Sequence, residues 1–373
     1  MSSSILVLGG GVIGLSCAFE LRRRGFRVTV LEIGKCGGQA SGAAAGMLAP
    51  FSENTEEPDP FFRLCLESLR LYPDWQRDIK EIAGPGFDFE YTNSGSLYVF
   101  YHEADILAME TRMQWQNEYG AAAELLDANG LSKLEPKISP KAAGALYYPR
   151  ESHVYAPGYV KALEQACRLT GVVIRDGLEH VSVSALEGGA AVTAASGERI
   201  AGDLLVVCSG AWTGLMEETF GLPIPIYPIR GQICAYETPD MPVNHMVFCS
   251  QGYVVTKRNG TLVCGASEDV AGFDTSVTRR GIARLQSWNG KLFPFLAGMQ
   301  PFHEWAGLRP ATNDGFPLIG ALKRSPSVIF ASGHYRNGIL LSPVTAQLVA
   351  NLIEQRGTGD IPMAAFDPER FNV

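Results

Sequence analysis

The sequence predicts an α/β protein, α+β overall, in which a β-α-β unit begins the chain and antiparallel strands fill much of the middle. Residues 5–8 form a short, continuously apolar run that is typical of a buried parallel strand. A glycine-rich turn, a helical pattern over 12–24 and a second strand over 27–32 complete the unit within about thirty residues. In contrast, residues 224–268 alternate between apolar and polar positions, with an Arg-Asn-Gly turn at 258–260, which indicates antiparallel hairpins.

The remaining elements follow from the same patterns. Apolar residues recur at helical spacing over 58–85, and residues 157–170 also have a helical pattern. Strand-like segments are expected over 171–207. A final strand over 327–332 and a helix over 343–355 follow towards the end of the sequence.

Two interleaved lobes are expected, because no internal repeat, low-complexity tract or long linker separates the chain into serial units. The predicted nucleotide lobe comprises residues 1–50, 150–220 and 305–373. The predicted substrate lobe is richer in sheet and comprises residues 51–149 and 221–304.

Composition argues against several classes of function. The chain has 31 basic and 39 acidic residues, a net charge of −8 and no basic patch, so nucleic acid is not an expected partner. Its eight cysteines form no C-x-x-C pair and have no metal-ligand spacing with the six histidines, so we expect reduced thiols, no metal site and a cytoplasmic location. The apolar stretch 5–19 is broken by glycines and is shorter than the roughly 20 residues of a membrane span, so we expect no anchor and no signal peptide.

The glycine turn predicts a dinucleotide site. Residues 9–14 read GGGVIG, which satisfies G-x-G-x-x-G between a strand and a helix. Gly9 permits the tight turn, Gly11 lets a pyrophosphate approach the backbone, and Gly14 lets the helix pack closely on the strand. The N-terminus of the helix supplies N–H groups and a positive dipole to the phosphates. Glu32, at the end of the second strand, is expected at the ribose hydroxyls; this acid disfavours NADP and leaves NAD and FAD open.

Four segments resemble one known family, and this resemblance favours FAD. Small residues fill 37–47 (GGQASGAAAGM), which is similar to the segment beneath the isoalloxazine ring in the D-amino acid oxidase superfamily. Residues 203–212 (DLLVVCSGAW) resemble the second nucleotide-lobe strand of that superfamily. Residues 305–320 contain WAGLRP and DGFPLIG, which resemble its substrate-carboxylate segment, and 333–343 (GHYRNGILLSP) resemble its C-terminal flavin loop.

Within the superfamily, AAAGML at 43–48 and GHYRNGILL at 333–341 are most similar to the glycine oxidases of thiamin biosynthesis. The resemblance covers essentially the whole chain. It implies a D-amino acid oxidase-like fold with a Rossmann-like FAD-binding lobe, and non-covalent FAD, because the C-terminal flavin loop contains no cysteine. The predicted FAD-site residues are Gly9, Gly11, Val12, Ile13, Gly14, Glu32, Ile33, Ala40, Ser41, Ala45, Gly46, Met47, Val181, Gly210, His334, Tyr335, Arg336, Asn337, Gly338, Ile339 and Leu340.

Arg309 is the predicted anchor for a substrate carboxylate. Its planar guanidinium can bind a carboxylate through two parallel hydrogen bonds. It lies in a mostly apolar segment, where an arginine without a partner would be costly to bury. The alternative is a structural ion pair with Asp314 or Glu304.

The resemblance also implies roles for other residues. Arg336 is expected at the rim of the active site, Tyr253 with its hydroxyl facing the substrate, and Met47 as a cap that keeps the pocket small. Tyr253 could instead be a packing residue of its strand. Glu268 stands where some relatives have an apolar residue, and its expected effect is on pocket polarity unless it simply faces water.

The predicted reaction is the oxidative deamination of glycine, with sarcosine and small D-amino acids as further substrates. No histidine, aspartate or glutamate emerges as a general base, so we expect hydride transfer from a neutral amine to flavin N5. Molecular oxygen is the expected acceptor, and the products are the imine or glyoxylate, ammonia and hydrogen peroxide, with use in thiamin thiazole synthesis. The backbone N–H groups of 337–340 are expected to stabilise negative charge on the reduced flavin.

Alternative functions stay open from the sequence. A sarcosine oxidase, or a D-amino acid dehydrogenase with another electron acceptor, would share every cofactor motif. An NAD-dependent dehydrogenase would share only the glycine turn. A dinucleotide-binding protein without catalysis would bind cofactor and turn nothing over. The family resemblance further implies a homotetramer.

Overall fold

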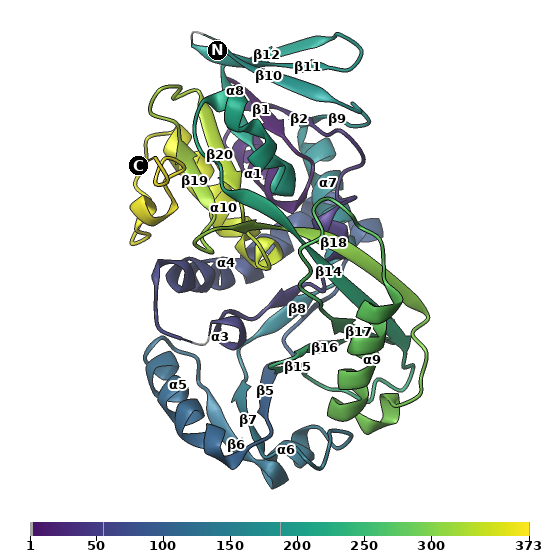
Figure 1. Ribbon diagram of the computed structural model, residues 1–373. Coiled ribbons are helices and arrows are strands. Elements are labelled where there is room, and N and C mark those ends of the chain that lie inside the picture. The colour runs from purple at the N-terminus through teal and green to yellow at the C-terminus, as the bar shows by residue number, and fades with distance from the viewer. Residues whose placement is uncertain (1–2, 55, 187, 373) are drawn as a thin grey trace.

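The computed structural model describes residues 3–54, 56–186 and 188–372. Two large sheets, of six and eight strands, dominate the fold and lie one above the other in Figure 1. The mixture of a mainly parallel and a mainly antiparallel sheet confirms the predicted fold class.

The six-stranded sheet is parallel except at one edge, where β19 runs antiparallel to β20. Along β1, Ile5 and Val7 face a layer of helices, whereas Leu6 and Leu8 face a small antiparallel sheet on the other side. Both faces of β1 are therefore buried, which explains its continuously apolar sequence. The strands in spatial order are β19 (Leu318–Ala321), β20 (Val328–Ser332), β13 (Leu204–Val207), β1 (Ser4–Leu8), β2 (Arg27–Leu31) and β9 (Val173–Arg175).

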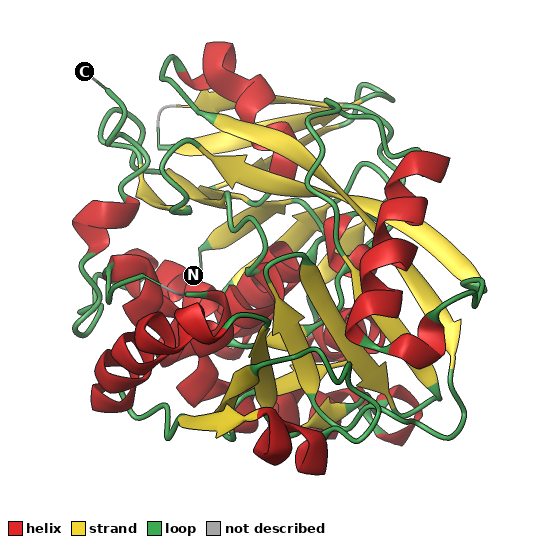
Figure 2. Cartoon of the chain, turned by 60° about the horizontal axis from the view of Figure 1, so that its bottom comes forward, coloured by secondary structure: helices red, strands yellow, loops and turns green. Residues whose placement is uncertain are grey.

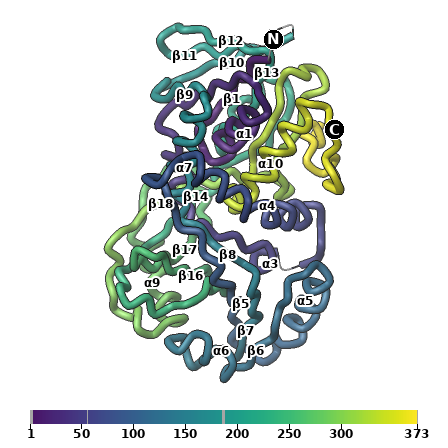
Figure 3. The backbone as a smooth tube through the Cα atoms, turned by 180° about the vertical axis from the view of Figure 1, so that it is seen from behind, coloured from purple at the N-terminus to yellow at the C-terminus, as the bar shows by residue number. Residues whose placement is uncertain are grey.

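Four helices pack on one another and on the first face of this sheet, as the view from behind shows (Figure 3). They are α1 (Val12–Arg23), α4 (Pro60–Ala83), α7 (Ala156–Thr170) and α10 (Gly338–Ile353). The small sheet on the other face consists of β10 (Val181–Leu186), β11 (Gly189–Ala194) and β12 (Arg199–Gly202).

The eight-stranded sheet is antiparallel except for the parallel pair β15–β5. Its strands in spatial order are β18 (His303–Thr312), β14 (Ile226–Glu237), β17 (Thr261–Gly265), β16 (Gly252–Lys257), β15 (Met246–Cys249), β5 (Ser96–Phe100), β7 (Gly144–Tyr148) and β6 (Glu124–Asp127). Helix α9 (Arg279–Leu292) buries Ile282, Leu285 and Trp288 against one face of this sheet. Figure 2 shows the strands of the fold from below, with helices beside them. The turn at 258–260 joins β16 to β17 as an antiparallel hairpin, as predicted.

Shorter elements complete the chain between and beside the two sheets. They are α2 (Ala40–Ala43), α3 (Pro50–Glu53), α5 (Ile106–Glu118), α6 (Ala128–Leu134), α8 (Glu217–Phe220) and the three-stranded sheet of β3 (Met47–Leu48), β8 (Ser152–Val154) and β4 (Tyr91–Thr92). Helix α2 and strand β3 lie in the small-residue segment of the sequence.

The C-terminal helix begins earlier than its predicted start at residue 343. Pro343 suggested a first turn, since proline is favoured there, but α10 begins at Gly338 and contains Pro343 in its interior. Proline cannot donate to the carbonyl four residues earlier, which belongs to Ile339. That carbonyl instead accepts hydrogen bonds from the hydroxyls of Tyr72, at 2.8 Å, and Ser342, at 2.9 Å. Contacts that the sequence does not reveal therefore stabilise the interior proline.

The lobe boundaries stay a prediction, although two elements lie across them. Strand β18 falls mostly in the predicted nucleotide lobe, yet it pairs with β14 along the eight-stranded sheet. Helix α4 falls in the predicted substrate lobe, yet it packs against α10 and α7. Of the two, only β18 contributes residues to the cavity described below.

A buried hydrogen-bond network holds the short helix α3. The Glu151 carboxylate accepts hydrogen bonds from the N–H groups of Phe51, at 2.6 Å, and Ser52, at 3.0 Å, at the start of α3. Arg112 Nη2 donates to the carbonyls of the same two residues, at 2.7 and 3.0 Å. A helix of four residues cannot hold itself together, so these side chains fix its position and that of Glu53 at its end.

Replacing Glu151 with alanine should lower the free energy of unfolding by about 2–4 kcal/mol, because two buried N–H groups lose their acceptor. Glu151→Gln keeps an acceptor and should retain most of the stability. Exposed Glu110 on α5 provides the control, Glu110→Ala. Urea denaturation measures all three, and equal losses in both Glu151 variants would contradict the assigned role.

The same residue predicts a pH dependence of stability. Burial raises the pKa of Glu151 from 4.5 to about 7. The unfolded chain therefore binds fewer protons between these two values, and the contribution of Glu151 to the free energy of unfolding falls as pH rises through them. Denaturation at several pH values should show this slope in the wild type and not in Glu151→Gln.

Candidate active site

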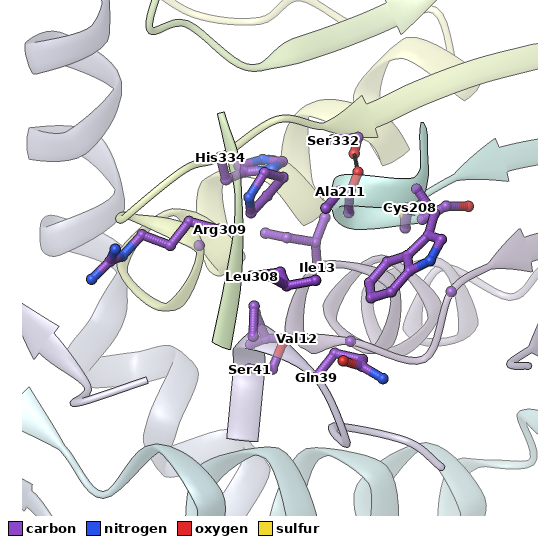
Figure 4. A pocket seen from close by; sticks show the side chains of 18 of the residues that line it. Val12, Ile13, Gln39, Ser41, Cys208, Ala211, Leu308, Arg309, Ser332 and His334 are labelled. Atoms are coloured by element: carbon purple, nitrogen blue, oxygen red, sulfur yellow. Dashed lines mark hydrogen bonds between the residues drawn. The ribbon is translucent and has the colours of Figure 1, made fainter. Parts of the chain in front are cut away.

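A cavity of about 530 Å³ lies between the two large sheets. It runs from β10 past the glycine turn after β1 to β16 and β18. The close view shows His334 and Ser332 on one side, Gln39 and Ser41 on the other, and Arg309 at one end (Figure 4). The small-residue segment and the C-terminal loop are brought together here, although they are far apart in sequence.

The glycine turn has the geometry that its spacing predicts. Gly9 has φ +114°, which a residue with a side chain rarely adopts. A Cβ added to Gly14 would lie 1.9 Å from the Gly9 carbonyl oxygen, so only glycine permits this approach of α1 to the turn. The Val12 N–H, at the start of α1, donates to Ser41 Oγ at 2.9 Å. Glu32 Oε2 accepts from the Gly10 N–H at 2.7 Å, so the acid lies beside the turn.

Most of the residues predicted for the cofactor line this cavity. The lining set is Gly9, Gly11, Val12, Ile13, Glu32, Ile33, Ala40, Ser41, Ala45, Gly46, Met47, Val181, Gly210, His334, Tyr335, Arg336, Gly338 and Ile339. Gly14, Asn337 and Leu340 are not among the residues that line it. Gly14 packs against the turn, and the Leu340 carbonyl accepts from Ser68 Oγ at 2.6 Å.

The C-terminal loop has its own internal bonds. The Asn337 N–H donates to the His334 carbonyl at 2.9 Å, so this group of the predicted N–H set is already bonded. His334 Nε2 lies 3.0 Å from Thr345 Oγ1, and burial lowers the pKa of His334 to about 3. His334 is therefore neutral and cannot act as an acid at neutral pH. Tyr335, with φ +45°, turns the chain into α10.

Arg309 extends from β18 into the cavity without a carboxylate partner among the described residues. Its Nη1 donates to the Ser267 carbonyl at 2.9 Å. A Cβ on Gly231 would lie 2.5 Å from the guanidinium, so this glycine leaves room for the side chain across the β14–β18 pair. The alternative ion pair with Asp314 does not form, since that acid binds Arg370 at 2.7 Å. Exposed Glu304 forms no ion pair with Arg309 either.

Tyr253 and Arg336 reach the same cavity from other elements. Tyr253 lies on β16 with 6% exposure, and burial, opposed by Arg309 and Arg336, raises the pKa of its hydroxyl to about 12. It therefore stays protonated at neutral pH. Arg336 lies in the C-terminal loop, and Glu53 and Glu268 flank it, with N···O distances of 3.7 and 3.5 Å. The nearby charge of Glu53, more than any other group, raises the pKa of Arg336.

The chain is similar to known proteins over nearly its whole length. The FAD dependent oxidoreductase family matches residues 4–352. The chain belongs to that family. It is 32% identical over 371 residues to the glycine oxidase of Geobacillus kaustophilus (strain HTA426), covering 99% of this chain and 96% of that protein.

A second relative and a solved structure agree with this placement. The bifunctional protein ThiO/ThiG of Synechocystis sp. is 31% identical over 376 residues, and the match covers 99% of this chain but 54% of that protein. The crystal structure of glycine oxidase from Geobacillus kaustophilus superposes with a TM-score of 0.92 at 30% identity, covering 99% of both chains. The predicted family and the predicted D-amino acid oxidase-like fold are confirmed.

The cavity of this family member fits its FAD. At the glycine turn and the start of α1, the N–H groups of Gly11 and Ile13 would face the phosphates, and Glu32 would lie beside them for the ribose. Small side chains at 43–46 line the cavity where a planar ring must approach backbone. Trp305 Nε1 donates to the Ala43 carbonyl at 2.9 Å and pins this segment against β18. The predicted cofactor is thus the one that the family uses.

Glu53 is the main residue that the sequence did not single out. It lines the cavity with a side chain only 8% exposed, and it lies at the end of α3 beside Arg336. Burial raises its pKa, although the charges of Arg336 and Arg309 oppose that rise. In the sequence it belongs to an acidic run, SENTEE, which is typical of a solvated loop, so no local signal marked it. No general base emerged from the sequence, and the structure adds Glu53 as a carboxylate in the cavity.

Two other groups of residues line the cavity without having been predicted. Trp212 and Cys208 follow strand β13, and Leu308 and Ile233 come from the β14–β18 pair. Apolar residues of this kind are common in any core, so only their place beside the cavity distinguishes them.

Gly14→Ala should weaken FAD binding at least tenfold, because the new Cβ would force α1 away from the Gly9 carbonyl. Gly86→Ala is the control, since nothing lies within 4 Å of its added Cβ. The ratio of flavin to protein absorbance after desalting, and titration of the apoprotein with FAD, measure the effect. Equal FAD retention in the two variants would contradict the packing role of Gly14.

Proposed function

We propose that the protein oxidises glycine, and with it sarcosine and small D-amino acids, to the imine, with molecular oxygen as the acceptor. One observation carries the proposal: Arg309 presents its guanidinium to the FAD cavity without a carboxylate partner among the described residues. Arg309 is partly buried, and a cation removed from water is stabilised when a ligand supplies the opposite charge. The glycine oxidase relatives support glycine as the substrate.

Arg309 binds the substrate carboxylate in this proposal. Its Nη1 bond to the Ser267 carbonyl and the space over Gly231 fix the direction of the guanidinium fork. The Tyr253 hydroxyl, which stays protonated, donates a further hydrogen bond to the carboxylate. Orientation of the α-carbon by these groups is the main contribution of the protein to rate.

The cavity favours a small substrate. Met47 lines the cavity at the end where Tyr253 and Arg309 lie, and these side chains limit the volume for a substituent on the α-carbon. One methylene group changes binding in a pocket by about 1–3 kcal/mol, so glycine, sarcosine and D-alanine are expected to differ in rate rather than to be accepted or refused outright.

Glu53 accepts the proton that the substrate ammonium must lose. Glycine enters mainly as the ammonium form at neutral pH, and only the neutral amine has the lone pair that forms the imine. The carboxylate of Glu53 lies in the cavity, and burial raises its pKa towards that of a useful base. Arg336 stays charged beside it and keeps the carboxylate available in its ionised form.

FAD, when bound, would accept one hydride equivalent, which is two electrons and a proton, from the substrate and pass the two electrons to oxygen. The net reaction is glycine plus oxygen plus water to glyoxylate, ammonia and hydrogen peroxide. Use of the imine in thiamin thiazole synthesis is part of the proposal, supported by the similarity to the bifunctional ThiO/ThiG protein.

The proposal includes a cytoplasmic location and a homotetrameric assembly. A cytoplasmic location is supported by the eight cysteines, all of which are free. No helix of the described residues is long and apolar enough to span a membrane. The predicted homotetramer rests on the family resemblance.

The deciding experiment measures hydrogen peroxide released by the purified protein with glycine, sarcosine and D-alanine, together with the visible spectrum. Peroxide from glycine, with flavin absorbance, is the expected result. Bleaching of the flavin by an amino acid without peroxide would indicate a dehydrogenase and overturn the choice of oxygen. A protein without flavin absorbance would overturn the proposal as a whole.

Arg309→Ala should raise the KM for glycine about 100-fold, since a charge-assisted hydrogen-bond pair is worth about 3 kcal/mol. FAD should stay bound, because no predicted cofactor contact involves this side chain. Arg280→Ala, at an exposed position of α9, is the matched control and should behave as the wild type. Unchanged glycine kinetics in Arg309→Ala would refute the assigned carboxylate site.

A further inference from the structure

Arg336 lies between two carboxylates of different exposure. Its Nη2 is 3.7 Å from Glu53 Oε1, and its Nη1 is 3.5 Å from Glu268 Oε1. The Glu53 side chain is 8% exposed, whereas that of Glu268 is 51% exposed. Glu53 lines the cavity, whereas the more exposed Glu268 contacts the other terminal nitrogen of Arg336 and is not among the lining residues. Arg336 is therefore not free to bind a second anionic group of a substrate, because it already has two acidic neighbours.

Glu268 is held in place from both sides. The Tyr335 hydroxyl donates to Glu268 Oε1 at 3.0 Å. Its neighbour Ser267 accepts from the Gln232 N–H at 2.9 Å and donates to Asp269 Oδ2 at 2.7 Å. Asp269 also forms a backbone bridge to the strand that contains Gln232. The position of this acid is thus fixed by the bond that its side chain accepts from Tyr335 and by the bonds of its neighbour Ser267.

The same segment contacts the proposed carboxylate anchor. The Ser267 carbonyl, directly before Glu268, accepts the hydrogen bond from Arg309 Nη1. A substrate bound to Arg309 therefore lies close to the backbone that carries Glu268. Any part of the substrate that extends from the α-carbon or the amine towards Arg336 approaches this carboxylate as well.

We propose that Glu268 is a specificity residue that restricts the site to substrates with one anionic group. A second carboxylate, on an acidic side chain or on the amine, meets the negative charge of Glu268 and finds Arg336 already paired. This inference rests on the proposed function, because it assumes that Arg309 binds the first carboxylate. At the partly exposed rim, like charges about 6 Å apart weaken binding of a dianion by about tenfold.

The test compares two anions that are not oxidised. Acetate carries one carboxylate and malonate carries two, and their dissociation constants are obtained from changes in the flavin spectrum of the FAD-loaded protein. The variant is Glu268→Gln, which keeps the size of the side chain and its capacity to accept the Tyr335 hydrogen bond. The control is Glu304→Gln, which removes the same charge from an exposed position of β18, roughly 16 Å along the strand from Arg309.

In Glu268→Gln, the dissociation constant of malonate divided by that of acetate should be about tenfold lower than in the wild type. Glu304→Gln should leave that ratio unchanged. The difference between Glu268→Gln and the wild type should narrow as ionic strength rises, because salt screens exposed charges and does not alter shape.

Two outcomes overturn the inference in distinguishable ways. If the malonate-to-acetate ratio is the same in Glu268→Gln and the wild type while both anions bind, Glu268 does not discriminate, and the proposed function stands. If neither anion binds to any of the three proteins, the carboxylate site at Arg309 is wrong, and both proposals fall together. Peroxide release from glycine tests the proposed function separately from either result.

Discussion

The hydrogen bond from Arg309 to the Ser267 carbonyl orients the Arg309 guanidinium, and the arrangement of the site depends on this positive charge. A guanidinium that enters a cavity between two sheets has to be oriented by groups that do not neutralise it. A neutral carbonyl orients it, Gly231 leaves space for it, and Asp314 is kept away by its pairing with Arg370. The cation therefore remains available to an anionic ligand. Had either nearby acid reached it, the same fold would hold a structural ion pair and no carboxylate site.

Three other charged side chains lie near Arg309: Glu53, Arg336 and Glu268. Glu53 lies within the cavity on a four-residue helix, and buried Glu151 and Arg112 hold that helix from behind. Arg336 then separates Glu53 from Glu268 at the solvent side. Neither Glu53 nor Glu268 forms an ion pair with Arg309, although both raise the pKa of Arg336. Arg336 therefore contacts both acids, whereas Arg309 has no carboxylate partner among the described residues and is the proposed carboxylate site.

The cofactor end of the cavity depends on backbone contact rather than on charge. Gly9 and Gly14 approach each other more closely than any side chain would permit. Gly307 approaches Ala43 in the same way, with an added Cβ only 2.7 Å from the alanine Cβ, so β18 and α2 lie close together. Because β18 also carries Arg309, the packing that positions the small-residue segment also positions the proposed substrate anchor. The two ends of the site are thus parts of one packed unit.

Local pattern was sufficient for much of this description. The β-α-β unit, the glycine turn, helices α4 and α7 and the hairpin at 258–260 follow from periodicity and turn residues, because these depend on neighbours in sequence. The family followed from motifs spread along the chain. The start of α10 was misplaced, since Tyr72 satisfies a carbonyl that Pro343 cannot, and that contact spans more than 260 residues. Neither periodicity nor proline preference contains such information.

The sequence by itself determined the fold class, the dinucleotide turn, the family and the residue types that a carboxylate-binding oxidase needs. Only the tertiary structure decided which charges meet. Glu53 appeared to be part of a solvated acidic run, Arg309 had two possible acidic partners in sequence, and Glu268 had no assignable neighbour. Side-chain charges act over a few ångströms in space whatever their separation along the chain, so their pairing follows from packing and not from pattern.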